Sequence, residues 1–175
     1  KDAREFLQNI VTNDINKVSD TSSCFASLLT PQGKYLFDFI IVKHKSGYFL
    51  DCEKKQADKL VDRLNVYKLN SSVEILNLSN EFEVAVISKD KFLDLDGAKD
   101  MEGNTLRYNN DAVILDPRSK ILGGRMISNF IGYLRKRFQK EFPQRKTSSF
   151  CLILWATMNI SKKITITMKF LHLNQ

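Results

Sequence analysis

Proline and glycine are scarce in this chain of 175 residues, which contains three prolines and seven glycines. This scarcity excludes collagen-like, proline-rich and low-complexity sequences. The hydrophobic content of 43% is enough to fill one core, so we expect the bulk of the chain to fold. The longest apolar run, residues 150–156, is far shorter than the roughly 20 residues that a helix needs to cross a bilayer. The sequence therefore predicts a globular domain without a membrane span.

Cysteine is equally sparse. Cys24, Cys52 and Cys151 are odd in number, far apart and not arranged as a CxxC pair. This pattern argues against a disulfide framework or a self-contained zinc site, and it favours a reducing compartment. The chain opens at Lys1 without the apolar segment of a secretory signal, and we interpret it as a piece of a longer protein.

The signatures of several catalytic classes are missing. The chain contains no GxGxxG, GxxxxGK[ST], HExxH or GxSxG motif. Its two histidines, His44 and His172, are too few for a multi-histidine metal site. The segment 94–97, Asp-Leu-Asp-Gly, has some likeness to a calcium loop, but the first and twelfth ligand positions would then be Phe92 and Gly103. Calcium binding is therefore not expected there.

Positive charge is concentrated at the carboxyl-terminal end. The formal net charge is +7, but residues 133–175 carry nine basic residues against one acid, which leaves the preceding 132 residues at −1. A near-neutral body with a basic end is not typical of a domain that binds duplex nucleic acid. The segment 135–138, Arg-Lys-Arg-Phe, leaves a weak RNA-binding module as one alternative.

Two segments have the apolar spacing of amphipathic helices. In residues 2–13 the apolar side chains recur at offsets of three and four, and Asp2 with Glu5 has the spacing of a capping box. In residues 53–67 the same spacing leaves the charged side chains on the opposite side. We predict a helix in each segment.

The remaining pattern is mainly that of β-strands. The expected strands are residues 24–29, 34–42, 48–52, 73–78, 82–87 and 112–115. The first three are separated by turn sequences, Pro31–Gly33 and Lys45–Gly47, which predicts a three-stranded meander. Because strands outnumber helices and do not alternate with them, the sequence predicts the α+β class, a mostly antiparallel sheet with flanking helices.

The composition changes after Pro143. Residues 142–175 contain no aspartate or glutamate, and residues 164–168 alternate like a strand. A solvated β-hairpin is one interpretation, and a tail foreign to the fold is the other, which we favour. We therefore divide the chain into a domain over residues 1–144 and an atypical basic tail over residues 145–175, truncated or frame-shifted.

Asp38 is an acid inside an apolar strand. Strand alternation places it on one face with Leu36, Ile40 and Val42, so we expect it to point where its neighbours are buried. A buried carboxylate needs a hydrogen-bond donor, and a heterocyclic ligand is one source of such a donor. From the residues alone, a structural role and a ligand-binding role both remain open.

Asn13 and Arg118 are two further candidates for a binding site. Asn13 follows the first predicted helix, where a turn stabilised by its own side chain is the alternative. Arg118, in the sequence Asp-Pro-Arg, is followed by Leu-Gly-Gly-Arg at 122–125. Two cations and two glycines around a turn would suit a ligand with a carboxylate. The alternative is that Arg118 pairs with Asp116 or is merely solvated.

These segments, taken in order, resemble the folate-binding family related to the aminomethyltransferase (T-protein) of the glycine cleavage system, and most closely its YgfZ-type branch. The resemblance covers roughly residues 2–144. It is carried by residues 2–8, 12–14, 28–34, 48–52, 64–69, 73–75, 116–118 and 122–123, together with Asp38. The family's Lys-Gly-Cys-Tyr-x-Gly-Gln-Glu signature is absent, so its cysteine role is not assigned to Cys151.

The resemblance implies an incomplete folate-binding domain with tetrahydrofolate in a central channel. Asp38 falls where the aminomethyltransferases have an acid that contacts folate, and with Asn13 and Arg118 it makes up our set of cofactor-binding candidates. No catalytic residue is assigned. The partners that the resemblance implies are folate and iron–sulfur enzymes or assembly factors, in the bacterial cytoplasm or the mitochondrial matrix. A membrane or nucleic-acid partner is not expected.

The leading hypothesis is therefore a tetrahydrofolate-binding accessory protein in iron–sulfur cluster assembly or maintenance, not itself an enzyme of known turnover. A folate-dependent aminomethyltransferase is the alternative. That branch would be expected to show an Asp-Asp pair, whereas Phe37 precedes Asp38 here.

Overall fold

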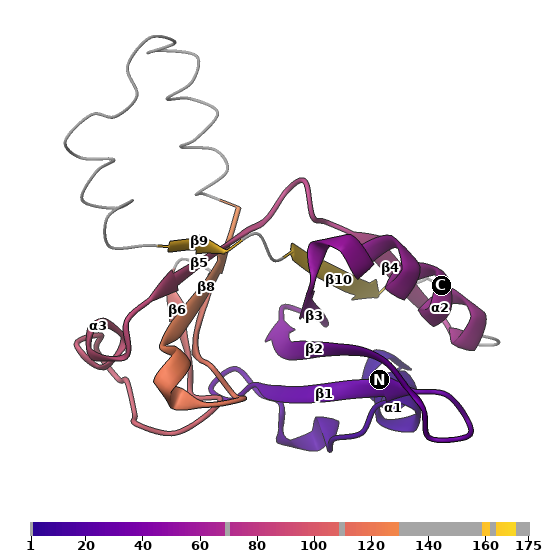
Figure 1. Ribbon diagram of the computed structural model, residues 1–175, viewed down its shortest axis with the longest axis horizontal. Helices are drawn as coiled ribbons and strands as arrows, with labels where there is room; N and C mark the ends of the chain where they lie inside the picture. The colour runs from indigo at the N-terminus through magenta and orange to yellow at the C-terminus, as the bar shows by residue number, and fades with distance from the viewer. Residues whose placement is uncertain (1, 69–70, 109–110, 130–158, 162–163, 171–175) are drawn as a thin grey trace, which may run out of the picture.

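The computed structural model describes residues 2–68, 71–108, 111–129, 159–161 and 164–170, which form two antiparallel sheets (Figure 1). The first sheet has the order β1-β2-β3-β10-β4 and contains β1 (Cys24–Leu29), β2 (Tyr35–His44), β3 (Gly47–Cys52), β4 (Val73–Asn77) and β10 (Ile164–Phe170). The second has the order β6-β7-β8-β5-β9 and contains β5 (Glu83–Ile87), β6 (Thr105–Tyr108), β7 (Asp111–Leu115), β8 (Gly124–Ser128) and β9 (Asn159–Ser161). The α+β class and its mostly antiparallel pairing are confirmed.

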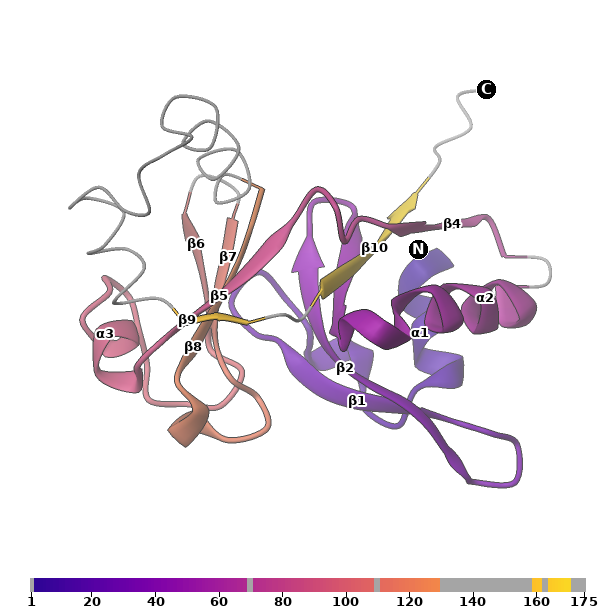
Figure 2. The same cartoon turned by 45° about the horizontal axis from the view of Figure 1, so that its top comes forward.

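Helices cover the outer faces of the two sheets. The helices are α1 (Asp2–Ile10), α2 (Ala57–Lys68) and α3 (Lys89–Leu93), with 3₁₀ turns η1 (Ile15–Lys17), η2 (Lys54–Gln56) and η3 (Lys120–Leu122). Figure 2 shows α1 and α2 on the side of the first sheet away from the second sheet. Both predicted long helices are confirmed. The first ends earlier than predicted, because Thr12 already donates its backbone N–H to Ser27 of β1.

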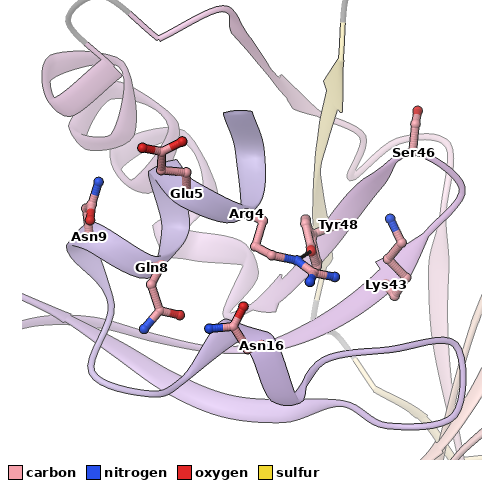
Figure 3. Close-up of a pocket in the computed structure, with 8 residues that line it drawn as sticks. All are labelled: Arg4, Glu5, Gln8, Asn9, Asn16, Lys43, Ser46 and Tyr48. Atoms are coloured by element: carbon pink, nitrogen blue, oxygen red, sulfur yellow. Dashed lines mark hydrogen bonds between the residues drawn. The ribbon is translucent and has the colours of Figure 1, made fainter. Parts of the chain in front are cut away.

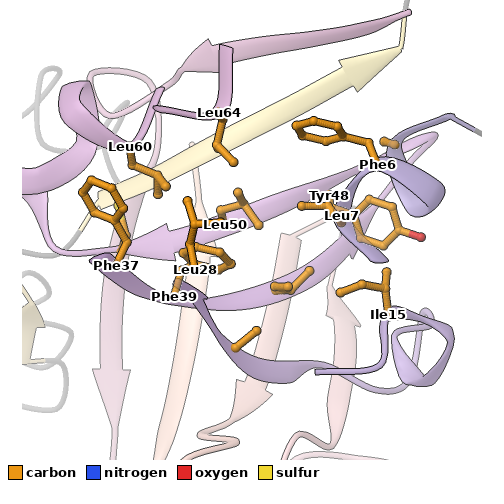
Figure 4. Close-up of a cluster of buried hydrophobic side chains, with 14 of the residues drawn as sticks. Phe6, Leu7, Ile15, Leu28, Phe37, Phe39, Tyr48, Leu50, Leu60 and Leu64 are labelled. Atoms are coloured by element: carbon orange, nitrogen blue, oxygen red, sulfur yellow. The ribbon is translucent and has the colours of Figure 1, made fainter. Parts of the chain in front are cut away.

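The alternation of β2 divides its side chains between two cores. Phe37, Phe39 and Ile41 face the helices, where they join the buried residues Phe6, Leu7, Leu60 and Leu64 (Figure 4). Ile40 and Val42 face the other way and pack with Phe49 against Val84, Ala112, Ile114 and Ile127 of the second sheet. The first sheet is therefore buried on both faces along part of its length, which explains the nearly continuous apolar sequence of β2.

Three strands escaped the sequence analysis. The predicted meander is confirmed, and the strands expected at 73–78, 82–87 and 112–115 correspond to β4, β5 and β7. β8 was not predicted because two glycines precede or begin it. A Cβ on Gly124 would lie 2.8 Å from Cγ1 of Ile87, so the absence of a side chain lets β8 lie close to β5. β6 and β9 were also missed.

The last described residues complete both sheets. β10 pairs with β3 on one side and β4 on the other, and β9 pairs with β5. The strand-like alternation of residues 164–168 is therefore realised as β10. The boundary proposed between residues 144 and 145 lies outside the described residues. Within the described part of the chain, the helices are too short or too polar to cross a membrane.

Candidate functional site

Asp38 lies on the face of the first sheet that turns towards the second sheet. It pairs with Ser27 of β1, and its face continues along β2 with Ile40 and Val42. The expectation that Asp38 is buried is wrong: its side chain is exposed, whereas Ile40 and Val42 are buried. The reason is that the apolar residues of the second sheet cover β2 only from Ile40 onwards. Asp38 is thus a solvated carboxylate beside the margin of a buried interface.

A buried ion pair joins the two sheets next to this margin. Asp51 of β3 is the cross-strand partner of Ile40, and it is 3% exposed. Arg125 of β8 donates from Nε to Oδ2 of Asp51 at 2.9 Å, and its Nη2 donates to the same oxygen. Arg125 was expected to be one of two cations available to a ligand. It is 4% exposed and held by Asp51, so that expectation is wrong for Arg125.

Arg118 is held in a fixed position by Asp116. Its Nε donates to Oδ1 of Asp116 at 2.9 Å, its Nη2 donates to Oδ2 at 2.6 Å, and its backbone N–H donates to Oδ1 at 3.0 Å. Burial works to raise the pKa of Asp116, but the hydrogen bonds and charge of Arg118 bring that pKa below its ordinary value. The pairing alternative for Arg118 is therefore observed. The side chain nevertheless remains 28% exposed.

Electrostatics connects Arg118 with Asp38. The pKa of Arg118 is raised first by its hydrogen bond with Asp116, and further by the negative charges of Asp116, Asp51 and Asp38. Two of the three predicted binding residues, Asp38 and Arg118, thus lie within electrostatic range of each other. We call Asp38, Asp51, Asp116, Arg118 and Arg125 the inter-sheet charge cluster.

Asn13 has a local structural role. Its Nδ2 donates to the backbone carbonyl of Phe25 at 2.8 Å, and its Oδ1 accepts from the backbone N–H of Asp14 at 2.8 Å. Phe25 is the cross-strand partner of Ile40, so Asn13 fastens the chain after α1 to the strand beside Asp38. The turn alternative is observed. A contact between Asn13 and folate remains a prediction.

The cluster offers a defined set of hydrogen-bonding groups. Asp38 can accept from N–H donors, and the exposed part of Arg118 can donate to an anion. Sequence reasoning missed Asp51. Strand alternation places Asp51 on the same face of the meander as Phe49, and this could have been read from the sequence. Its partner Arg125, however, comes from the other sheet. Within the described residues, no group of three or more His, Cys, Asp or Glu side chains is arranged to hold a metal ion.

His44 continues the Asp38 face to the far end of β2. Its ring centroid lies 4.2 Å from that of Phe49 and 6.3 Å from that of Phe82. Burial, reinforced by the positive charges of Lys45, Arg107 and Lys43, lowers the pKa of His44 to about 4. His44 is therefore a neutral aromatic component of the interface at physiological pH.

Curated proteins similar to this chain form two groups, while no protein-family model matches it. An aminomethyltransferase of Alkaliphilus oremlandii is 33% identical over 88 residues, which are 49% of this chain and 24% of that protein. A protein of Dictyostelium discoideum named as a mitochondrial homologue of the iron–sulfur cluster assembly factor IBA57 is 24% identical over 152 residues, which are 72% of this chain and 37% of that protein. The corresponding homologue of Neurospora crassa is 26% identical over 136 residues, which are 73% of this chain and 31% of that protein. The chain thus spans well under half the length of these relatives.

Proposed function

Because this chain is a relative of the aminomethyltransferases and of the IBA57-type factors, we propose that it is a tetrahydrofolate-binding accessory protein of iron–sulfur cluster assembly. The observation that carries the proposal is the extent of the similarity. The alignments with the two IBA57 homologues cover 72% and 73% of this chain, whereas the alignment with the aminomethyltransferase of A. oremlandii covers 49% of it. The IBA57 branch therefore accounts for more of this sequence.

The inter-sheet charge cluster fits a folate. A reduced pterin presents N–H donors along its ring edge, which the exposed carboxylate of Asp38 can accept, and the glutamate end of a folate presents carboxylates, which suit Arg118. When bound, tetrahydrofolate supplies nitrogen atoms that can carry a one-carbon unit. Arg118 is oriented in advance by Asp116, and this lowers the entropy that it loses when it meets a ligand.

Folate-dependent aminomethyl transfer is the second candidate function, favoured by the 33% identity with the enzyme of A. oremlandii. One feature of the fold counts against it. Phe37, which stands where that branch is expected to have the first acid of a pair, is 9% exposed and belongs to the core beneath α1 and α2. An acid at this position would be buried among apolar side chains, which is costly.

The partners and location follow from the IBA57 relatives. We propose that the partners are iron–sulfur enzymes or their assembly factors. We also propose the mitochondrial matrix as the location, because the two IBA57 homologues are named as mitochondrial proteins. The RNA-binding alternative rests on residues 135–138, which lie outside the described residues, and no observation favours it.

Two experiments test this function. Anaerobic calorimetric titration of the full chain with tetrahydrofolate should give saturable binding with one site. Expression in cells that lack their own IBA57-type protein should restore the activity of cluster-dependent enzymes. Binding without restoration would retain the folate site and refute the assembly role. Restoration without binding would refute the folate site, and failure of both would refute the proposal.

A further inference from the structure

A polar pocket lies on the opposite face of the first sheet from Asp38. Its volume is about 480 Å³, within the range of small-molecule sites. It is lined by Arg4, Glu5, Gln8 and Asn9 of α1, Asn16 of η1, Lys43 of β2, Ser46 of the β2–β3 turn and Tyr48 of β3 (Figure 3). The packing of α1 against the β2–β3 hairpin thus brings together polar residues that are distant in the sequence.

Arg4 is positioned in the pocket by a buried tyrosine. The Nε of Arg4 donates to the hydroxyl of Tyr48 at 3.1 Å, and Tyr48 is 2% exposed. This hydrogen bond uses one side of the guanidinium and leaves its two terminal nitrogens available to another acceptor. A guanidinium oriented in this way can bind a carboxylate or a phosphate through two parallel hydrogen bonds.

Lys43 supplies a second positive charge. Its amine lies 5.1 Å from the centre of the Tyr48 ring, and Figure 3 shows it on the same side of the pocket as the guanidinium of Arg4. Burial lowers the pKa of Lys43; among the nearby charges that of Asp20 has the largest effect and raises this pKa, while the charges of Arg4 and Arg107 lower it. The two cations are thus close enough to repel each other.

These cations have no carboxylate partner in the described part of the chain. Neither Arg4 nor Lys43 takes part in any of the ion pairs observed there, and the nearby Asp20 pairs with Arg107 at 3.6 Å. Glu5 lines the same pocket, and Figure 3 shows its carboxylate turned away from Arg4. Repulsion between neighbouring cations is relieved by an anion placed between them.

Neutral donors complete the pocket. The Oε1 of Gln8 accepts from the backbone N–H of Ile15 at 2.7 Å, so its amide nitrogen is the end that remains for a ligand. The carboxamide of Asn16 lies between Gln8 and Arg4 in Figure 3. The pocket therefore offers the charged donors Arg4 and Lys43 together with neutral amide donors, a combination that suits an anion.

We propose that this pocket binds a small organic anion through its phosphate or carboxylate oxygens, with Arg4 and Lys43 as the charged contacts and Asn16 and Gln8 as neutral donors. The volume of about 480 Å³ leaves room for an anionic group that is part of a larger molecule. This site is separate from the proposed folate site, because Lys43 and Tyr48 lie on the face of the first sheet opposite Asp38.

The test uses pyrophosphate and citrate as the phosphate and carboxylate probes. Titration of the ¹⁵N-labelled full chain at about 150 mM salt, where the Debye length is about 8 Å, suppresses unspecific attraction. We expect saturable shifts of the Arg4, Asn16 and Tyr48 amides with at least one probe. Arg4→Gln and Lys43→Gln should each weaken binding roughly tenfold or more. Tyr48→Phe should weaken it less, because it releases Arg4 without removing it.

Lys34→Gln is the matched control, since Lys34 is an exposed lysine in the β1–β2 turn and its replacement changes the net charge equally. Equal weakening by Lys34→Gln would overturn the proposal, as would the absence of saturable shifts with both probes at millimolar concentration. Preference for pyrophosphate or for citrate identifies the anionic group. Asp38→Asn should leave this binding unchanged, so the outcome does not depend on the folate site.

Discussion

Asp38 carries the clearest functional prediction at the scale of single residues. Asp38→Asn should weaken tetrahydrofolate binding by about ten- to a hundredfold, because a hydrogen bond between a ligand and a charged group contributes roughly 1.5–3 kcal/mol. Since Asp38 is exposed, the melting temperature should hardly change. Paired calorimetric titration and thermal melting measure both effects. The control is Asp62→Asn, which removes an exposed acid of α2. Normal affinity in Asp38→Asn would refute the site.

His44 makes the stability of the protein depend on pH. Its pKa is lowered from 6.5 to about 4 in the folded state, so between these values the unfolded chain binds more protons. Stability should therefore fall as the pH falls from 6.5 towards 4. His44→Phe keeps an aromatic ring against Phe49 and removes the titrating group. The unfolding free energy of this variant, measured by urea unfolding at several pH values in this range, should therefore change less with pH. An equal dependence of the unfolding free energy on pH in both proteins would contradict this explanation.

The sequence predicted Asp38 and Arg118 as members of the candidate site but not Asp51, because burial depends on the second sheet. Asp38 was found because an acid interrupts an apolar strand, and Arg118 because it is one of two cations that lie with two glycines around a turn. Alternation gives the face of a residue, but it does not say how far a second sheet covers that face. This is why Asp38 was wrongly expected to be buried and why Asp51, which truly is buried, was overlooked.

At the scale of elements, strong periodicity was reliable, whereas short strands with little periodicity, such as β6 and β8, were missed. The spacing of α1 and α2 and the turns of the β1–β3 meander depend on local sequence, and both were predicted. β8 begins with Gly124 and carries Arg125, so its sequence lacks the usual features of a strand. Its position is determined by pairing with β7 on one side and, on the other, with β5, which is distant in sequence.

The two glycines Gly123 and Gly33 both have a positive φ, but a side chain would meet very different surroundings at the two positions. Both have φ near +80°, but a Cβ on Gly123 would lie 2.2 Å from the carbonyl oxygen of Ile87, whereas one on Gly33 would meet nothing within 4 Å. Gly33→Ala should cost about 1 kcal/mol from the left-handed conformation alone. Gly123→Ala should cost several times more, because β8 must move away from β5. Urea unfolding of both variants measures the difference, and equal costs would contradict the predicted clash.

At the scale of the whole molecule, the buried ion pair between Asp51 and Arg125 joins the two sheets beside the apolar side chains that pack between them. Arg125→Met keeps a side chain of similar length and leaves Asp51 buried without its cation, so we expect a loss of about 3–5 kcal/mol in unfolding free energy. Adding Asp51→Asn should recover part of this loss. Urea unfolding followed by circular dichroism measures it, with Arg63→Met on the exposed side of α2 as the control. An unchanged midpoint for Arg125→Met would show that the pair does not couple the sheets.

The position of β10 has a consequence for the order in which the protein can fold during translation. β3 and β4 are separated by only about twenty residues of sequence, yet they are not neighbours in the first sheet, because β10 lies between them. While the ribosome is still making the segment before residue 164, the facing edges of both strands have unpaired backbone groups. Such edges attract strands from other chains. The nascent protein therefore remains vulnerable to aggregation until β10 emerges from the ribosomal exit tunnel, and a chaperone that shields β3 and β4 during this interval would raise its yield.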